Sequence, residues 1–233
     1  MGIRKDAIMK SKSALVLEEL RSKLRTASVA QVGGFRPTAD PITSWFLKGV
    51  ALPGEGLPVW KGQPMFPLLQ IRVDELPVIP EQLKGIALLV LYHNMESHPF
   101  DKPHGEGWLI REYATLDGLE LLPAINTPYR AFPVRWVSVN DDAPGWEDAW
   151  DIIDLSDVND DEDASDRFYD GFNRYRGTKV GGYPMEIQHG VGIQDFVFQV
   201  GSEEKVNWMW ADNGIGYFHK FPEGLWTFSC QFY

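Results

Sequence analysis

The chain has 233 residues, of which 44% are apolar and 13% aromatic, so it fills a substantial core and is too aromatic for a disordered protein. Its net charge of -11 is concentrated in residues 141–170, which contain thirteen acidic residues and one arginine and so carry a charge of -12. A single cysteine excludes an intrachain disulfide, and no run of apolar residues is long enough to predict a membrane span.

The N-terminal third begins with a helical pattern. Leu17, Leu20 and Leu24 recur on one face of residues 13–25, which predicts an amphipathic helix, and we assign residues 1–30 to this helical region. The first residues lack the apolar core and cleavage site of a signal peptide, so we expect a cytoplasmic protein.

The remaining pattern is one of short strands separated by Gly and Pro. Apolar runs at 68–73, 86–92, 108–113 and 134–139 predict strands. Residues 206–211 and 215–219 flank Asn213-Gly214, which predicts a tight hairpin. At the end of the chain Trp226, Phe228, Cys230 and Phe232 alternate with polar residues, which predicts a strand with one buried face.

An internal repeat links the two ends of this strand-rich region. The Val-Gly-Gly-aromatic motif at 32–35 matches the one at 180–183, and a proline follows each. Gln70 matches Gln199, and a Gly-Ile pair follows each glutamine after 15 residues. The shared spacing predicts a duplication, with one β-rich repeat at 31–140 and another at 177–233, joined by an acidic connecting segment at 141–176.

These paired motifs, together with the sequence from Trp210 to Phe218, resemble the YwqG-like family of bacterial proteins of unknown function. The resemblance is best over 179–233 and rests on fewer residues in the first half, where Pro53 to Pro67 form an insertion. It implies an α+β fold of two similar halves, with mostly antiparallel sheet that follows an N-terminal helix. It brings no known reaction, and it implies a link to candidate toxin-immunity families.

The loop after the second predicted strand is the main candidate for metal chemistry. It contains six residues of metal-ligating types: His93, Glu96, His98, Asp101, His104 and Glu106. Their spacing matches no established zinc signature, so a solvated loop remains the simpler interpretation, and a metal-dependent hydrolytic enzyme remains an alternative function.

Other catalytic patterns are weaker. Cys230 lies on the predicted apolar face of its strand, where burial makes a thiol inert. No nucleophile elbow, phosphate-binding loop or zinc-protease helix occurs in the sequence. Asp157, Asn159, Asp161 and Asp163 alternate like calcium ligands but lack the glycine and closing glutamate of a calcium loop. We therefore assign no catalytic residues, no metal and no cofactor.

The acidic segment is the candidate binding site. Aromatic residues interrupt its carboxylates, which is unusual for a solvated linker, although a linker remains an open interpretation. Carboxylates around aromatic anchors suit the capture of a basic protein and repel nucleic acid. The predicted partner-binding residues are Asp141, Asp142, Trp146, Glu147, Asp148, Trp150, Asp160, Asp161, Glu162 and Asp163.

The predicted function is therefore non-catalytic protein binding in the cytoplasm. Its most concrete form is an immunity protein that neutralises a basic, nuclease-like bacterial toxin by occupying its phosphate-binding groove. We expect neither nucleic acid nor membrane as a partner. A ligand-binding or scaffold module that uses exposed tryptophans such as Trp60, Trp146 and Trp150 remains a further alternative.

Overall fold

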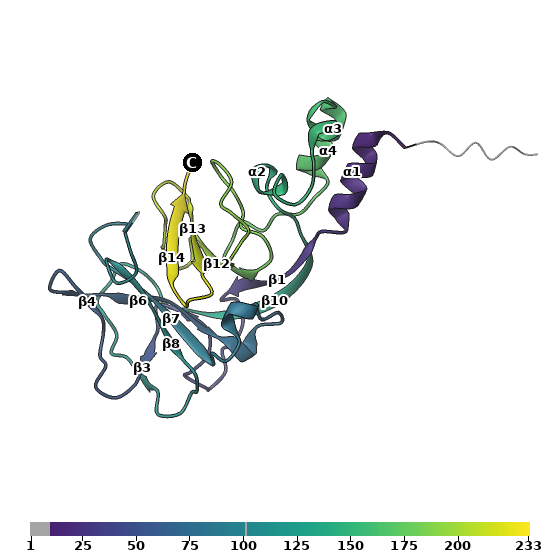
Figure 1. Ribbon diagram of the computed structural model, residues 1–233. Helices are drawn as coiled ribbons and strands as arrows, with labels where there is room; N and C mark the ends of the chain where they lie inside the picture. The colour runs from purple at the N-terminus through teal and green to yellow at the C-terminus, as the bar shows by residue number, and fades with distance from the viewer. Residues whose placement is uncertain (1–9, 101) are drawn as a thin grey trace, which may run out of the picture.

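The computed structural model describes residues 10–100 and 102–233 (Figure 1). Its longer helices are α1 (Lys12–Arg21) and α4 (Glu162–Asp170), and its short ones are α2 (Trp146–Ala149), α3 (Ser156–Asn159) and the 3-10 helices η1 (Val73–Glu75) and η2 (Glu81–Leu83). The strands are β1 (Arg25–Val32), β2 (Trp45–Phe46), β3 (Val50–Ala51), β4 (Val59–Trp60), β5 (Gln63–Pro64), β6 (Phe66–Arg72), β7 (Leu88–His93), β8 (Trp108–Tyr113), β9 (Glu120–Leu121), β10 (Phe132–Asp142), β11 (Lys179–Gly181), β12 (Phe196–Gly201), β13 (Ile215–Lys220) and β14 (Trp226–Gln231).

Ten of these strands form one sheet in the order β14-β13-β12-β11-β1-β10-β2-β6-β7-β8. Every strand pair in it is antiparallel, so the fold is a mostly antiparallel β structure with few helices. The long strands β1 and β10 pair at its centre over seven residue pairs, from Arg25↔Asp142 to Val32↔Val134. The sheet therefore consists of two arms that extend from a shared central pair.

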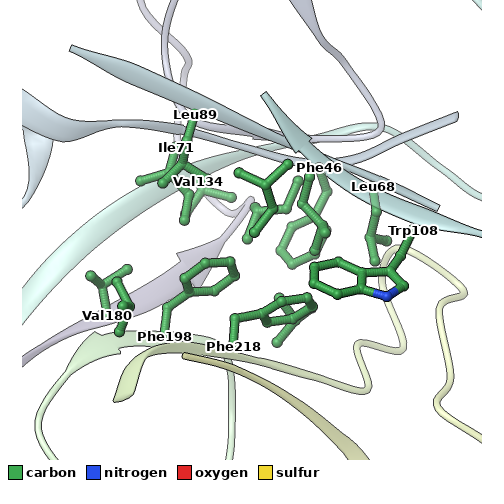
Figure 2. Packing of buried hydrophobic residues seen from close by; sticks show 14 of the residues in the cluster. Phe46, Leu68, Ile71, Leu89, Trp108, Val134, Val180, Phe198 and Phe218 are labelled. Atoms are coloured by element: carbon green, nitrogen blue, oxygen red, sulfur yellow. The ribbon is translucent and has the colours of Figure 1, made fainter. Parts of the chain in front are cut away.

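The two arms curl toward each other and bury the main core between them. Trp108 of β8 packs against Phe218 of β13 and Phe228 of β14, with ring centroids 5.8 and 5.5 Å apart. Figure 2 shows Leu68, Ile71, Leu89 and Trp108 from one arm facing Val180, Phe198 and Phe218 from the other. The runs of apolar residues in β6, β7 and β12 are buried throughout because both faces of these strands are covered.

The order of the strands bears on the expected repeat. Gln70 on β6 and Gln199 on β12 occupy equivalent places in the two arms, and the side-chain amide of each donates to backbone carbonyls just before the neighbouring strand. The Gly-Gly motifs instead follow β1 and β11, which are not equivalent, although all four glycines have φ between 58° and 76°. The duplication itself remains a prediction.

The N-terminal region differs from the expected helix over residues 1–30. Helix α1 ends at Arg21, and Arg25–Val32 form a central strand of the sheet; residues 1–9 lie outside the described part. Strand β1 mixes exposed, half-buried and buried residues without strict alternation, so its sequence pattern does not identify it as a strand.

The acidic segment is a folded unit and not a solvated linker. Helices α2, α3 and α4 pack with α1 into a helical layer, which Figure 1 shows beside the ends of β1 and β10. Its own apolar core contains Leu17 and Leu20 from α1, with Leu155, Val158 and Phe168 from the acidic segment. The expected boundaries at residues 30 and 141 therefore separate parts that fold together.

The hairpin expected at Asn213-Gly214 is wrong. Residues 206–211 contain turns and one isolated bridge, Glu203↔Trp208, but no strand, and β13 pairs with β12 and β14. Val206, Trp208 and Trp210 are buried while Asn207 and Met209 are exposed, which explains the strand-like alternation. The positive φ expected at this turn is present at Asn213, where it is 53°.

The terminal strand β14 follows the expected pattern only in part. Trp226 and Phe228 are buried, but Cys230 is half-buried and Gln231 is buried. The Gln231 side chain accepts the backbone N–H of Ile187 at 2.7 Å, so a polar contact draws it inward. Burial raises the pKa of the Cys230 thiol to about 12, which agrees with an unreactive cysteine.

Candidate functional site

The helical layer carries most of the protein's negative charge on its outer surface. Of the thirteen acidic residues in 141–170, nine are exposed: Glu147, Asp151, Asp154, Asp157, Asp160, Glu162, Asp163, Asp166 and Asp170. Because they lie on or between α2, α3 and α4, folding brings them to one unit. We call this surface the acidic face.

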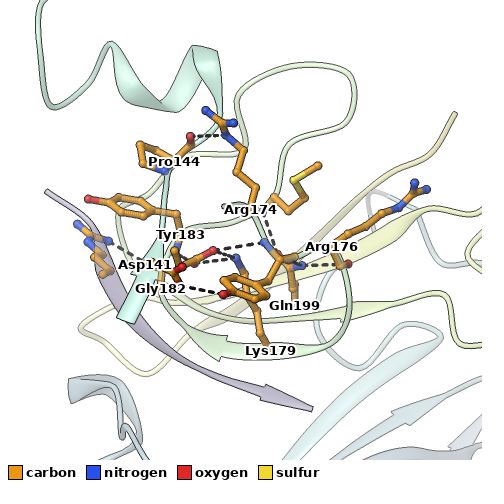
Figure 3. Close-up of polar contacts among 12 residues, drawn as sticks. Asp141, Pro144, Arg174, Arg176, Lys179, Gly182, Tyr183 and Gln199 are labelled. Atoms are coloured by element: carbon orange, nitrogen blue, oxygen red, sulfur yellow. Dashed lines mark hydrogen bonds and ion pairs between the residues drawn. The ribbon is translucent and has the colours of Figure 1, made fainter. Parts of the chain in front are cut away.

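Two predicted partner-binding residues, Asp142 and Asp148, are not on that face. Asp142 is completely buried, and its carboxylate accepts the Lys179 Nζ at 2.7 and 2.8 Å and the backbone N–H of Tyr183 at 2.8 Å. Figure 3 shows Lys179, Tyr183 and Gly182 around this contact. Burial raises the pKa of the Asp142 carboxyl and lowers that of the Lys179 ammonium, while their mutual attraction opposes both shifts.

Asp148 is also buried, and it serves the fold. Its Oδ1 accepts the backbone N–H of Gly192 at 2.8 Å, which ties α2 to the loop before β12. Burial raises the pKa of its carboxyl. The burial of Asp142 and Asp148 was not evident from the sequence, because sequence alone does not distinguish a carboxylate that anchors a loop from one that faces water.

Asp141 and Asp161 are half-buried and hold neighbouring segments in place. Asp161 caps α4, since its carboxylate accepts the backbone N–H of Ala164 and the hydroxyl of Ser13 in the helix α1 at 2.6 Å. Asp141 accepts the Tyr175 hydroxyl at 2.7 Å and the Asn173 amide at 2.6 Å. Asp161 is thus already engaged in hydrogen bonds. To bind calcium together with the other residues considered above, it would have to give up its contacts with Ser13 and Ala164.

Three aromatic side chains contact one another on the helical layer, of which two are exposed and Trp146 is half-buried. Trp146 stacks on Tyr169 with ring centroids 5.8 Å apart and meets Trp150 edge to face at 6.2 Å. Trp150 is 42% exposed and Tyr169 is 55% exposed. Phe168, which meets Trp146 at 4.9 Å, and Phe172 are buried in the core of the layer and support these rings from below. We call Trp146, Trp150 and Tyr169 the aromatic ridge.

A pocket of about 450 Å³ opens beside the ridge. Trp146 and Tyr169 line one side, and Glu186, Arg174 and Met185 line the other. The Glu186 carboxylate accepts the backbone N–H of Glu147 at 3.2 Å and so holds the start of α2. Burial raises the pKa of this carboxyl, and no ion pair involves it within 10–100 and 102–233.

Arg174 fixes the shape of the pocket. Its guanidinium donates to the carbonyls of Pro144 at 2.8 Å and Phe168 at 3.1 Å and stacks 4.5 Å from the Phe168 ring (Figure 3). Sequence analysis missed both Arg174 and Glu186. Neither belongs to a periodic pattern, and Glu186 comes from a loop some 40 residues from α2, so no local signal identifies them.

The five candidate metal ligands of the histidine loop that the structure describes do not form a metal site. His93 and His98 pack edge to face, 5.6 Å apart, inside a cluster with Trp208 and Trp210. His104 Nε2 accepts the backbone N–H of Ile110 at 2.8 Å, and Glu96 and Glu106 are exposed; Asp101 lies outside the described residues. Three or more metal-ligating side chains do not gather anywhere in the described ranges.

The comparison with known proteins defines the family. A search of the curated proteins found no match, and among the helices of the described ranges none is both long enough and apolar enough to cross a membrane. A family model described as a domain of unknown function, DUF1963, matches residues 50–225, which include the acidic face, the aromatic ridge and most of both sheet arms. The chain therefore belongs to the DUF1963 family, the domain of unknown function whose model it matches.

Proposed function

We propose that this protein is a non-catalytic binding protein that captures a basic protein partner on its acidic face and aromatic ridge. The observation that carries the proposal is that nine exposed carboxylates and the mutually contacting rings of Trp146, Trp150 and Tyr169 belong to one folded unit. A linker would leave such aromatic side chains without support, whereas here Phe168 and Phe172 hold them from below.

Charge and aromatic contact have separate tasks in this proposal. The acidic face attracts a basic surface over long range and raises the association rate, and this effect weakens with salt. The ridge then supplies flat apolar area, which contributes to the lifetime of the complex once water is excluded.

The pocket beside the ridge suits one basic side chain of the partner. A lysine or arginine head group that enters it meets the Glu186 carboxylate, which has no ion-pair partner in the described residues, and the rings of Trp146 and Tyr169. Rings of this kind attract cations through their faces. Arg174 also lines the pocket, and its guanidinium is held by the backbone carbonyls of Pro144 and Phe168.

The concrete partner we propose is a basic, nuclease-like toxin, with the protein acting in the cytoplasm as its immunity protein. A carboxylate-rich surface competes with phosphate for the groove of such an enzyme. We also retain, as part of the proposal, YwqG-like membership within the wider family, with which the match to DUF1963 is compatible.

The test measures binding of basic proteins with three exposed carboxylates neutralised. The variant Asp160→Asn/Glu162→Gln/Asp163→Asn leaves the Asp161 cap intact. A partner is captured from lysate of the source cells at low salt, identified and purified, and its association and dissociation rates are then measured at several salt concentrations. We expect the variant to lower the association rate on the order of tenfold at low salt.

A matched control carries the same change of charge elsewhere. Glu106→Gln/Glu120→Gln/Glu223→Gln removes three exposed carboxylates outside the helical layer and should leave the rates nearly unchanged. Trp150→Ala should raise the dissociation rate more than the association rate. Equal reductions of the association rate in the layer variant and in the control would contradict the proposal, since binding would then follow net charge alone.

A further inference from the structure

A second cavity lies outside the helical layer, in the arm of the sheet that contains β6. The first residues of β6 and two loops line it. Its volume is about 510 Å³, within the range of small-molecule sites. The loop at 37–41 and the turn after β2 form one wall, and the loop at 121–131 forms the other, with Phe66 and Pro67 of β6 between them.

The interior of this cavity is mostly apolar. Trp45, Leu47, Phe66, Ile125 and Tyr129 supply aromatic and aliphatic surface, and several prolines stiffen the surrounding loops. Leu47 adopts φ of 59°, which is costly for a side chain of this kind, and non-glycine residues in such strained conformations cluster at ligand sites. The cavity is therefore suited to a ligand with an apolar body.

The unpaired polar groups at the cavity are hydrogen-bond donors. Lys48 Nζ lies 3.5 Å from the centre of the Trp45 ring and forms no ion pair with any residue the structure describes. Burial raises the pKa of Tyr129, so its hydroxyl remains a donor at neutral pH. The one carboxylate in the lining, Asp40, is paired with Arg72, whose Nη1 lies 2.6 Å away and which also pairs with Asp74.

The surroundings of the cavity carry a small excess of positive charge. A smaller cavity of about 290 Å³ shares Pro37 and Thr38 with it and is lined by Arg36, Arg135 and Glu75. In a protein with net charge -11, these two cations against one carboxylate distinguish this region from the acidic face. From these observations we propose that the cavity binds a small amphipathic molecule with an apolar body and one carboxylate, whose charge is held by Lys48.

Calorimetric titration with three probes of equal chain length tests the proposal: decanoate, decanol and decyltrimethylammonium. We expect saturable 1:1 binding of decanoate, with an affinity higher than that of either of the other probes. Lys48→Gln should weaken decanoate about tenfold and leave decanol unchanged, because only the anion loses a charged donor.

Lys61→Gln is the matched control. Lys61 also lies over a tryptophan, 4.1 Å from the Trp60 ring, but it does not line the cavity, so decanoate binding should persist. Ala124→Trp and Ala39→Trp place a large ring at exposed positions of the lining and should each abolish binding while the thermal unfolding midpoint is retained.

Three results would overturn the proposal: no saturable binding of decanoate, unchanged binding in both folded tryptophan variants, or an equal effect of Lys48→Gln and Lys61→Gln. None of these measurements involves the acidic face. The cavity can therefore fail this test while protein binding succeeds, and the reverse also holds.

Discussion

The side chains of Lys179 and Asp142 form an ion pair that is closed to solvent at the junction between the helical layer and the sheet. The exposed fractions of the two side chains are 1% and 0%. A buried charge is tolerated only with a partner, and removing one member leaves the other uncompensated. The pair therefore links β10 to β11 across the intervening strand β1, at the point where the chain enters the layer.

We expect Lys179→Met to lower the free energy of unfolding by about 3–5 kcal/mol, measured by urea denaturation. Lys84→Gln, which breaks an exposed ion pair with Glu81, should cost no more than about 1 kcal/mol. If the two variants lose similar amounts of unfolding free energy, the buried pair stabilises the fold no more than the exposed pair does.

The burial of His93 predicts that the free energy of unfolding depends on pH. Its Nδ1 lies 2.6 Å from the Asn94 carbonyl oxygen, and burial lowers the pKa of the ring from 6.5 to about 3. Between these values the unfolded chain binds a proton that the folded chain does not. Stability is therefore fully present above pH 6.5 and is lost as the pH falls, by about 1.4 kcal/mol per unit for this group.

His93→Phe should remove that part of the dependence, because phenylalanine keeps a ring in the cluster and does not titrate. The measurement is the free energy of unfolding in urea at pH 7, 6 and 5. If the variant keeps the slope of the parent protein, the acid sensitivity arises from other groups, such as the half-buried His219.

At the scale of elements, the sequence predicted where strands occur better than it predicted which strands pair with each other. The strand expected at 108–113 coincides with β8, and that at 134–139 lies within β10. Their alternation or apolar character is a local signal. The missed strand β1 and the wrong hairpin depend on contacts between distant segments, such as the packing of Trp208 against His93 at 4.9 Å, which local pattern does not record.

The candidate site shows the same limit. The positions of Trp146, Trp150 and the exposed carboxylates follow from the composition of the acidic segment, so the sequence identified the segment that carries them. It did not show that α1 completes the layer, because Leu17 and Leu20 meet Phe168 and Val158 only after nearly 140 residues of intervening chain. A contact of that range has no signature in the spacing of either segment.

The packing of the helical layer predicts that mutating two different leucines of α1 has unequal effects on stability. Leu20 is buried in the core of the layer, and Leu15 is 53% exposed on the same helix. We expect Leu20→Ala to lower the free energy of unfolding by about 2–5 kcal/mol, and Leu15→Ala by less than about 0.5 kcal/mol. Hydrogen exchange should show the loss of protection first in α1, α3 and α4, since α1 packs directly on the other two.

At the scale of the whole molecule, the two arms of the sheet meet through polar contacts as well as through the core. Glu112 on β8 accepts the Trp226 Nε1–H of β14 at 2.7 Å and pairs with Lys220 of β13 at 2.7 Å. Strands β8 and β14 are the two edges of the sheet, so these contacts join its ends. They lie at the rim of the aromatic core around Trp108.

Glu112→Ala should therefore destabilise the closure of the two arms. The variant removes a charge-assisted hydrogen bond and leaves Trp226 Nε1 and the mostly buried Lys220 without their partner, a loss of about 2 kcal/mol in the free energy of unfolding. Glu120→Ala, an exposed glutamate on β9, provides the control. Hydrogen exchange distinguishes the mechanism: loosened closure exposes amides of β8 and β14 together, whereas a loss confined to β8 would show that Glu112 supports only its own strand.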